Sequence, residues 1–273
     1  MAAPTKKIFT VGLNAARIYE LDADGYIDGT ETAYDGTAVG GPVVFTYEPP
    51  DPESIVHPGN NTVLQRDVLP SQETASGTLE VSRTDYDTIA LLNNVNVNVI
   101  GEANSVLWGS NQAGTEPTVG LVVYAQGKGP SGNRTWSTYV IPKCTIIPKP
   151  KGMAREQANI KYFVQPQAAT AHLTGMAFTI SDDGATAGEM VQYESNYRMH
   201  FTSWNKTTSS ATFTLGTSYP MVSTAGLTVY KDGVKQTTGY TATTGAITFT
   251  SNVTEGTNVA AMYELAESAS DLE

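Results

Sequence analysis

Short stretches in which apolar and polar residues alternate recur along most of the chain. The period of two is clear in segments 8–13, 77–82, 119–124 and 158–164. In a strand, successive side chains point to opposite faces of the sheet, so this period places one face of each stretch against a core. The pattern predicts four strands here, each with one buried face.

A single segment departs from this pattern and shows helical spacing. Residues 82–85 resemble a capping box with Asp85 in place of the usual Glu, and Ile89, Ala90 and Leu92 follow at helical intervals. Acidic residues at the start suit the positive end of the helix dipole. We expect one short helix over 84–92, packed on one flank of a sheet.

Two stretches have the composition of long connections. Residues 48–61 contain too many prolines for a central strand, and 125–133 are glycine-rich, as at the tip of a hairpin. Long connections within compact domains are uncommon unless they serve binding or assembly. We expect a long polar loop in the first stretch and a hairpin turn in the second.

The composition changes near residue 200, where Thr-rich stretches with short apolar runs begin. Asp232-Gly233 and Thr244-Gly245 separate alternating segments, and Asp-Gly in that position is a strong hairpin signal. The chain length also exceeds the usual size of one domain. We predict a first domain over 1–200, a small β-sandwich over 201–265 and an acidic tail over 266–273. The expected fold class is all-β: a β-sandwich or barrel with one flanking helix, followed by the small sandwich.

The negative charge is concentrated in the N-terminal part of the chain. The net charge is −11, and residues 1–102 hold fifteen of the acidic side chains but only five of the basic ones. Binding to nucleic acid through phosphate neutralisation needs clustered Lys and Arg, which this composition does not provide. No apolar run reaches the ~18 residues of a membrane helix, so no membrane partner is expected.

Residues that usually carry chemistry are few. The three histidines, His57, His172 and His200, share no metal-ligand spacing, and none neighbours Cys144. An EF-hand loop starting at Asp22 would need Gly at its sixth position, where Ile27 stands. No phosphate-binding glycine loop or nucleophile elbow occurs. We therefore expect no cofactor, no metal and no enzymatic activity.

The first 200 residues resemble the major tail proteins, or tail tube proteins, of long-tailed non-contractile bacteriophages. The likeness rests on a strand pair at 7–12 and 17–21, a long polar loop, and the segment 73–82 leading into the helix at 84–92. Residues 203–264 resemble the small Ig-like or fibre-type domains often appended to phage tail proteins, and 229–236 with Gly239-Tyr240 carries that likeness.

The resemblance implies a structural subunit of the virion that is made in the host bacterial cytoplasm. Such subunits form rings, usually six-fold, that stack into a tube through which DNA passes without adhering. No internal repeat of tube-domain length occurs, so a hexamer is expected. The implied partners are other copies of the chain and the tape measure, tail terminator and tail tip proteins. Pairing of edge strands between subunits would remove the exposed-edge liability, and head-to-tail stacking would give a filament.

Acidic side chains on the channel wall would repel DNA phosphates over a screening length of about 8–10 Å. The candidates for this role are three strand-borne acids, and each of them is equally compatible with an outward position or a subunit contact. They are Glu20, Glu73 and Glu80.

Contacts between rings or subunits have a second set of candidates, because a basic stretch contrasts with the acidic loop 48–53. A solvated strand face explains the basic stretch equally well, and exposed ion pairs contribute only about 0–1 kcal/mol each. The acidic candidates are Glu48, Asp51 and Glu53, and the basic ones are Lys143, Lys149, Lys151 and Arg155, with Lys161 in the same stretch.

Other functions remain open from the sequence. A phage adhesin or fibre protein would bind host-surface glycans, and Trp108, Trp136 and Trp204 would be its stacking candidates, although core packing is the commoner role of tryptophan. A tube protein of a bacterial injection machine, such as the haemolysin-coregulated protein of type VI secretion, is a second alternative, and an enzyme is a distant third.

Overall fold

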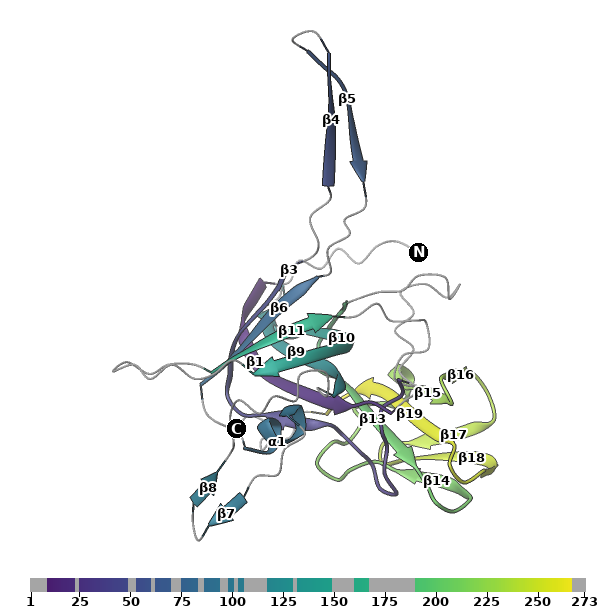
Figure 1. The fold of residues 1–273 in the computed structure, drawn as a ribbon. Coiled ribbons are helices and arrows are strands. Elements are labelled where there is room, and N and C mark those ends of the chain that lie inside the picture. Colours follow the sequence, from purple (N-terminus) through teal and green to yellow (C-terminus); the bar gives the residue numbers. More distant parts are fainter. Residues whose placement is uncertain are drawn as a thin grey trace.

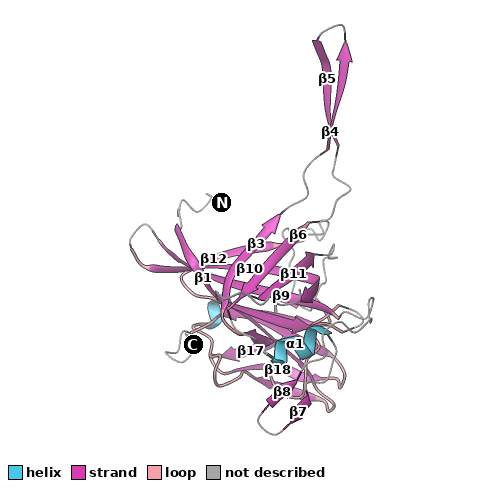
Figure 2. Cartoon of the chain, turned by 60° about the vertical axis from the view of Figure 1, so that its left-hand side comes forward, coloured by secondary structure: helices cyan, strands magenta, loops and turns pink. Residues whose placement is uncertain are grey.

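The computed structural model of the chain describes residues 9–22, 25–48, 53–59, 62–69, 75–82, 86–93, 98–100, 103–105, 117–129, 132–148, 160–166 and 190–266. Strands dominate these ranges, and the all-β fold class predicted from the sequence is confirmed (Figure 1, Figure 2). The described strands form open sheets and no closed barrel.

An eight-stranded antiparallel sheet makes up most of the first part. Its hydrogen-bonded path runs through seven strands, and β12 (Val191–Ser195) pairs with β10 beside that path. In spatial order the seven are β2 (Thr37–Val39), β1 (Phe9–Glu20), β9 (Thr118–Lys128), β10 (Arg134–Pro148), β11 (Ile160–Pro166), β6 (Ser76–Val81) and β3 (Pro42–Glu48).

Strand β10 belongs to both halves of this sheet. Residues 136–140 pair with β12, and residues 144–148 pair with β11. Between them the register with β9 shifts from Ile141 to Cys144, across Pro142. A bulge bends a strand and increases its twist, so the sheet curls and β3 comes to lie against β1.

A first core fills the inside of the curl. Buried side chains from β6, β9, β10 and β11, such as Leu79, Leu121, Ile146 and Val164, pack there. The helix α1 (Tyr86–Asn93) places Leu92 in the same core. The helix lies within two residues of the range predicted from the sequence and flanks the sheet as expected (Figure 2).

The C-terminal residues form two further sheets with their own core. One sheet has the order β13 (Met199–Asn205), β19 (Asn258–Glu264), β15 (Thr228–Lys231), β16 (Val234–Gln236). The other has the order β14 (Ser210–Thr214), β18 (Ala246–Val253), β17 (Tyr240–Thr243), and a short 3₁₀ helix, Thr224–Gly226, precedes β15. Phe213, Val229 and Ile247 are among the side chains buried between the sheets. We call these strands together the C-terminal sandwich.

The predicted Asp-Gly turn is present between β15 and β16. Asp232 and Gly233 have φ of 45° and 74°, and Lys231 pairs with Val234 across the turn. Two consecutive residues with positive φ form the turn whose twist matches that of a two-stranded hairpin.

A third core joins the C-terminal sandwich to the eight-stranded sheet. Tyr19, Tyr124 and Trp136 on the outer face of β1, β9 and β10 pack against Met199 and Phe201 of β13. This half of the sheet is therefore covered on both faces: by the first core inside and by the C-terminal sandwich outside.

Two expectations from the sequence are wrong in detail. The predicted strand pair at 7–12 and 17–21 is one continuous strand within the described residues, β1, and two register shifts absorb the irregular positions near Gly12 and Asn14. The proline-rich stretch expected to be a loop contains β4 (Glu53–Gly59), which pairs with β5 (Thr62–Leu69). The prolines are tolerated because the hairpin has two edges and its register shifts at Pro58.

The β4–β5 hairpin extends away from the eight-stranded sheet (Figure 1, Figure 2). A second, shorter hairpin, β7 (Asn98–Ile100) with β8 (Ala103–Ser105), follows the helix in the chain.

Candidate assembly surfaces

The eight-stranded sheet ends at β3 without a further strand. Strand β6 pairs with one side of β3, and none of the other described strands pairs with its second side. The first half of β1 is in a similar position, because β2 covers only Ala16–Ile18 of it. Rows of backbone N–H and C=O groups at such edges are ready to pair with another chain.

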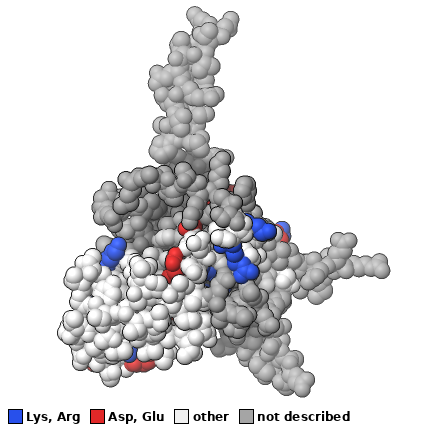
Figure 3. All heavy atoms as spheres, turned by 180° about the vertical axis from the view of Figure 1, so that it is seen from behind, with Lys and Arg blue, Asp and Glu red and all other residues white. Residues whose placement is uncertain are grey.

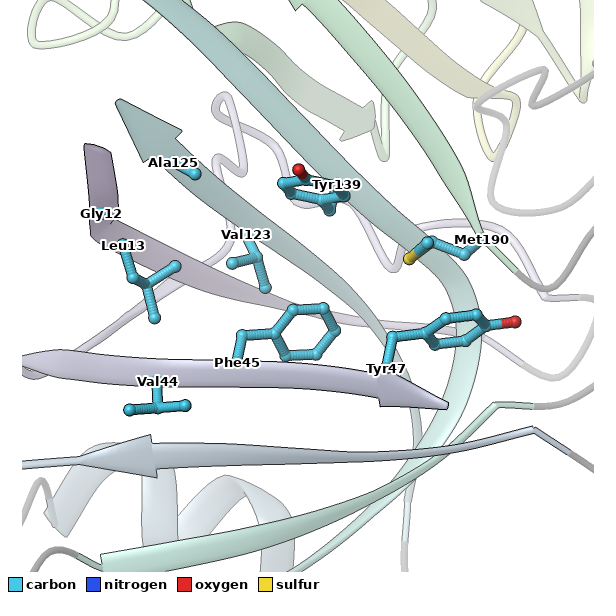
Figure 4. Close-up of a pocket in the computed structure, with 9 residues that line it drawn as sticks. All are labelled: Gly12, Leu13, Val44, Phe45, Tyr47, Val123, Ala125, Tyr139 and Met190. Atoms are coloured by element: carbon cyan, nitrogen blue, oxygen red, sulfur yellow. The ribbon is translucent and has the colours of Figure 1, made fainter. Parts of the chain in front are cut away.

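An apolar cavity of about 450 Å³ lies between these two edges (Figure 4). Phe45 and Tyr47 of β3 face Val123 and Tyr139 across it, while Val44 points to the other side of β3. The remaining lining residues are Gly12, Leu13, Ala125 and Met190. The cavity is therefore an apolar gap between two strands that do not pair with each other.

The outer face of the other half of the sheet carries no described layer. Here β3, β6, β11 and the end of β10 lie in register, so Thr46, Thr78, Phe163 and Ile147 form one cross-strand row. Ile147 is 36% exposed and Val44, one row away, is 40% exposed. We call this surface, made by the outward residues of β3, β6, β11 and residues 144–148 of β10, the uncovered face.

An ion pair lies beside this row. Lys161 of β11 contacts Glu80 of β6, with 2.6 Å between Nζ and Oε1, and the two residues are directly paired across the strands. The Glu80 side chain is 19% exposed and that of Lys161 is 55% exposed, so water screens the pair and its contribution stays below about 1 kcal/mol. The charge of Glu80 is thus compensated on the same face.

The other predicted channel acids do not join Glu80. Glu20 lies at the end of β1 with much of its side chain in solvent; the burial that remains at its carboxyl, and then the nearby Asp28, raise the pKa of that carboxyl. Glu73 lies outside the described residues. Of the three candidates for a channel wall, Glu80 is the one that the structure describes on the uncovered face, and its role there stays a prediction.

The predicted inter-ring residues are described only in part. Glu48 is exposed at the end of β3, and Lys143 is half-buried in β10. Glu53 begins β4, but its side chain is not described. Asp51, Lys149, Lys151 and Arg155 lie outside the described residues. Side chains are thus described only for Glu48 and Lys143, and contact between the acidic and basic sets across rings or subunits stays a prediction.

On the face seen from behind, the described Lys, Arg, Asp and Glu side chains lie scattered among uncharged residues (Figure 3).

Nucleophilic and metal-binding groups do not assemble in the described ranges. No three His, Cys, Asp or Glu side chains come together there as metal ligands would. Cys144 is buried, and burial raises the pKa of its thiol. None of the described helices has the length and apolar character of a membrane span. The expected lack of a cofactor and of enzymatic activity stays a prediction.

The tryptophans considered for sugar stacking are not at the surface where they are described. Trp136 is fully buried and Trp204 is 1% exposed, and both belong to hydrophobic cores. Trp108 lies outside the described residues.

Sequence reasoning missed two features of this region. It did not anticipate the cavity, because β1 and β3 approach only after the sheet has curled. It counted Lys161 in a basic stretch without pairing it with Glu80, although alternation in 77–82 and 158–164 places both residues on outward faces. Only the register between β6 and β11 shows that they are neighbours.

Comparison with known proteins adds no family to this description. The sequence matches no family model and no curated protein.

Proposed function

We propose that this chain is a structural subunit of the tail tube of a long-tailed, non-contractile bacteriophage. Copies assemble into rings, and we expect six copies a ring because the sequence has no internal repeat of tube-domain length. The rings stack into a channel through which DNA passes on its way into the host. The tape measure, tail terminator and tail tip proteins are the expected partners, and the virion tail is its location.

The observation that carries the proposal is the open end of the eight-stranded sheet. Among the described strands, none pairs with the second side of β3 or with the first half of β1 on the side away from β9, and an apolar cavity lies between these two strands. A strand of a neighbouring copy would satisfy those groups, and repetition around a ring would leave no free edge. Contacts of this head-to-tail kind close into rings when the rotation per subunit permits it.

Two further features suit the same role. The C-terminal sandwich occupies the outer face of one half of the sheet, which leaves the uncovered face as the candidate channel wall. The β4–β5 hairpin extends from the body, and such an arm suits contact with a neighbouring ring (Figure 1). On the uncovered face, hydroxyl side chains and a compensated ion pair would let a duplex pass without strong phosphate contacts.

Electron microscopy of the purified full-length protein tests the proposal. Hollow tubes built of stacked rings are expected, and Val44→Lys should reduce tube formation without unfolding the protein, because a charged edge strand resists pairing. Val234→Lys is the matched control: Val234 is also an exposed valine on an edge strand, but in β16 of the C-terminal sandwich.

Stable monomers under all conditions of concentration and salt would refute the proposal. Equal tube formation by the Val44 and Val234 variants would remove the β3 edge from the assembly interface. Binding of host glycans by a discrete, non-polymerising oligomer would favour the adhesin instead.

A further inference from the structure

The segment between β1 and β2 is built into the C-terminal sandwich. Tyr34 and Ser203 of β13 exchange two backbone hydrogen bonds, with N···O distances of 2.9 and 3.1 Å, and the amide of Asn205 donates to the carbonyl of Thr30 at 2.9 Å. β13 has β19 on one side, and on its other side the segment meets it through two isolated bridges, Thr30 with Trp204 and Tyr34 with Ser203.

Further contacts hold the same segment. The side-chain amide of Asn258 donates to the carbonyl of Ile27 at 2.8 Å, and a Cβ added to Gly29 would lie 2.7 Å from the carbonyl carbon of Trp204. Residues 26–36 therefore follow the C-terminal sandwich closely, although they belong to the N-terminal part of the chain.

We call the contact between residues 26–36 and the C-terminal sandwich the joint. A buried histidine, His200, lies at its centre. Nε2 of His200 lies 2.9 Å from Oδ1 of Asp35, and no part of its side chain is exposed. Its ring stacks on Tyr219 with centroids 4.7 Å apart and meets the ring of Tyr263 at 5.4 Å. Its other ring nitrogen, Nδ1, has no hydrogen-bond partner among the described residues.

Two arginines complete the surroundings of the histidine. Arg17 of β1 donates to the carbonyls of Asp35 and Gly36 and to the hydroxyl of Tyr219. Arg198 precedes β13 and is 5% exposed. A charged imidazole here would have one carboxylate in contact but two cations nearby and an N–H at Nδ1 without an acceptor.

These surroundings favour the neutral imidazole in the closed joint. Burial lowers the pKa of His200; Asp35 opposes this effect, while Arg17 and Arg198 reinforce it. In an opened joint the imidazole is hydrated and has its ordinary pKa of about 6.5. Since the opened form binds a proton that the closed form excludes, opening becomes easier as the pH falls below about 6.5.

We propose that the His200–Asp35 contact is an acid-sensitive latch that fastens residues 26–36 of the N-terminal part to β13 of the C-terminal sandwich. The latch is closed at neutral pH and loosens on acidification. It is a property of one chain and holds whether or not the chain forms tubes.

Hydrogen exchange on the full-length protein at pH 7.5 and 5.5 tests the latch, with protection factors corrected for intrinsic exchange. The amides of Tyr34, Ser203 and Asn205 report opening, and the β9–β10 ladder is the internal reference. We expect opening at the three amides to rise by up to about tenfold at pH 5.5, since one pH unit below the ordinary pKa gives that ratio. The reference amides should change much less.

Two variants make the test specific. His200→Gln keeps an amide donor for Asp35 but cannot be protonated in this range, so its opening should not depend on pH. Asp35→Asn removes the group that favours a charged imidazole in the closed joint, so the acid response should become larger.

Several results would overturn the latch. Acid opening in His200→Gln equal to that of the wild type would show that another group titrates. Increased protection of the wild type at pH 5.5, abolished in Asp35→Asn, would show that the contact is a stabilising ion pair instead. If His200→Gln fails to fold, the direction of the Asp35→Asn change still decides between these two accounts.

Discussion

Truncation of Phe201 should destabilise the whole molecule, because its ring is shared by the eight-stranded sheet and the C-terminal sandwich. The side chain is fully buried in the core that joins them. Its ring centroid lies 6.4 Å from that of Tyr19 of β1 and 6.5 Å from that of Tyr193 of β12. Phe201→Ala removes both ring contacts and leaves a cavity that can close only if the two sheets move toward each other, which their other contacts resist.

The expected loss is about 3–5 kcal/mol, the range for replacing a buried Phe by Ala in a rigid core. For a chain of this size each kcal/mol lowers the melting temperature by about 2–4 °C, so the midpoint should fall by about 6–20 °C. Calorimetry gives the midpoint, and urea unfolding gives the free energy of unfolding at an unchanged m-value. Val234→Ala, at a 60% exposed valine, is the control and should stay within about 0.5 kcal/mol of the wild type.

The reasoning fails in either of two cases. A loss below about 1 kcal/mol would mean that the core joining the two parts does not depend on this ring. A melt in which β18 loses exchange protection early while the β9–β10 ladder keeps its wild-type midpoint would mean that the two parts unfold independently.

Three further outcomes are expected. Gly29→Ala should cost about 1–3 kcal/mol in urea unfolding, because the added Cβ meets the backbone of Trp204, whereas Gly245→Ala, which meets nothing within 4 Å, should cost far less. Burial raises the pKa of Tyr193 to about 12, so the folded state keeps a proton that the unfolded state loses above pH 10. The free energy of unfolding should therefore fall by roughly 2 kcal/mol between about pH 10 and pH 12, and Tyr193→Phe should flatten this dependence. Glu80→Lys breaks the ion pair with Lys161 and leaves two cations on the uncovered face. Under the proposed tail-tube function, particles with this substitution should assemble tubes but eject DNA more slowly, and an unchanged ejection rate would argue against this face as the channel wall.

Local signals in the sequence predicted local structure well. Alternation with a period of two identified β1, β6, β9 and β11. The capping pattern before Ile89 located the helix, and Asp232-Gly233 predicted a turn that has the required positive φ values. Each of these features depends on residues that are close together in the sequence, so a short segment contains the pattern that predicts it.

Features that depend on register across distant segments were missed. His200 and Asp35 are 165 residues apart, and neither has neighbours in the sequence that mark it as part of a buried pair. The approach of β1 to β3, which forms the apolar cavity, depends on how far the sheet curls at the bulge near Pro142. The proline content of 48–61 was a sound argument against a central strand, but it does not exclude a two-stranded hairpin.

The shared strand β10 has a mechanical consequence. One end of it lies in the half of the sheet that bears the C-terminal sandwich, and the other end lies two strands from the open edge at β3. A load applied to that edge passes through the hydrogen bonds of β6 and β11 to β10, and the single backbone of β10 then carries it to the core around Trp136 and Phe201. A force on β3 would thus tilt the C-terminal sandwich. The bulge near Pro142 is where β10 would bend.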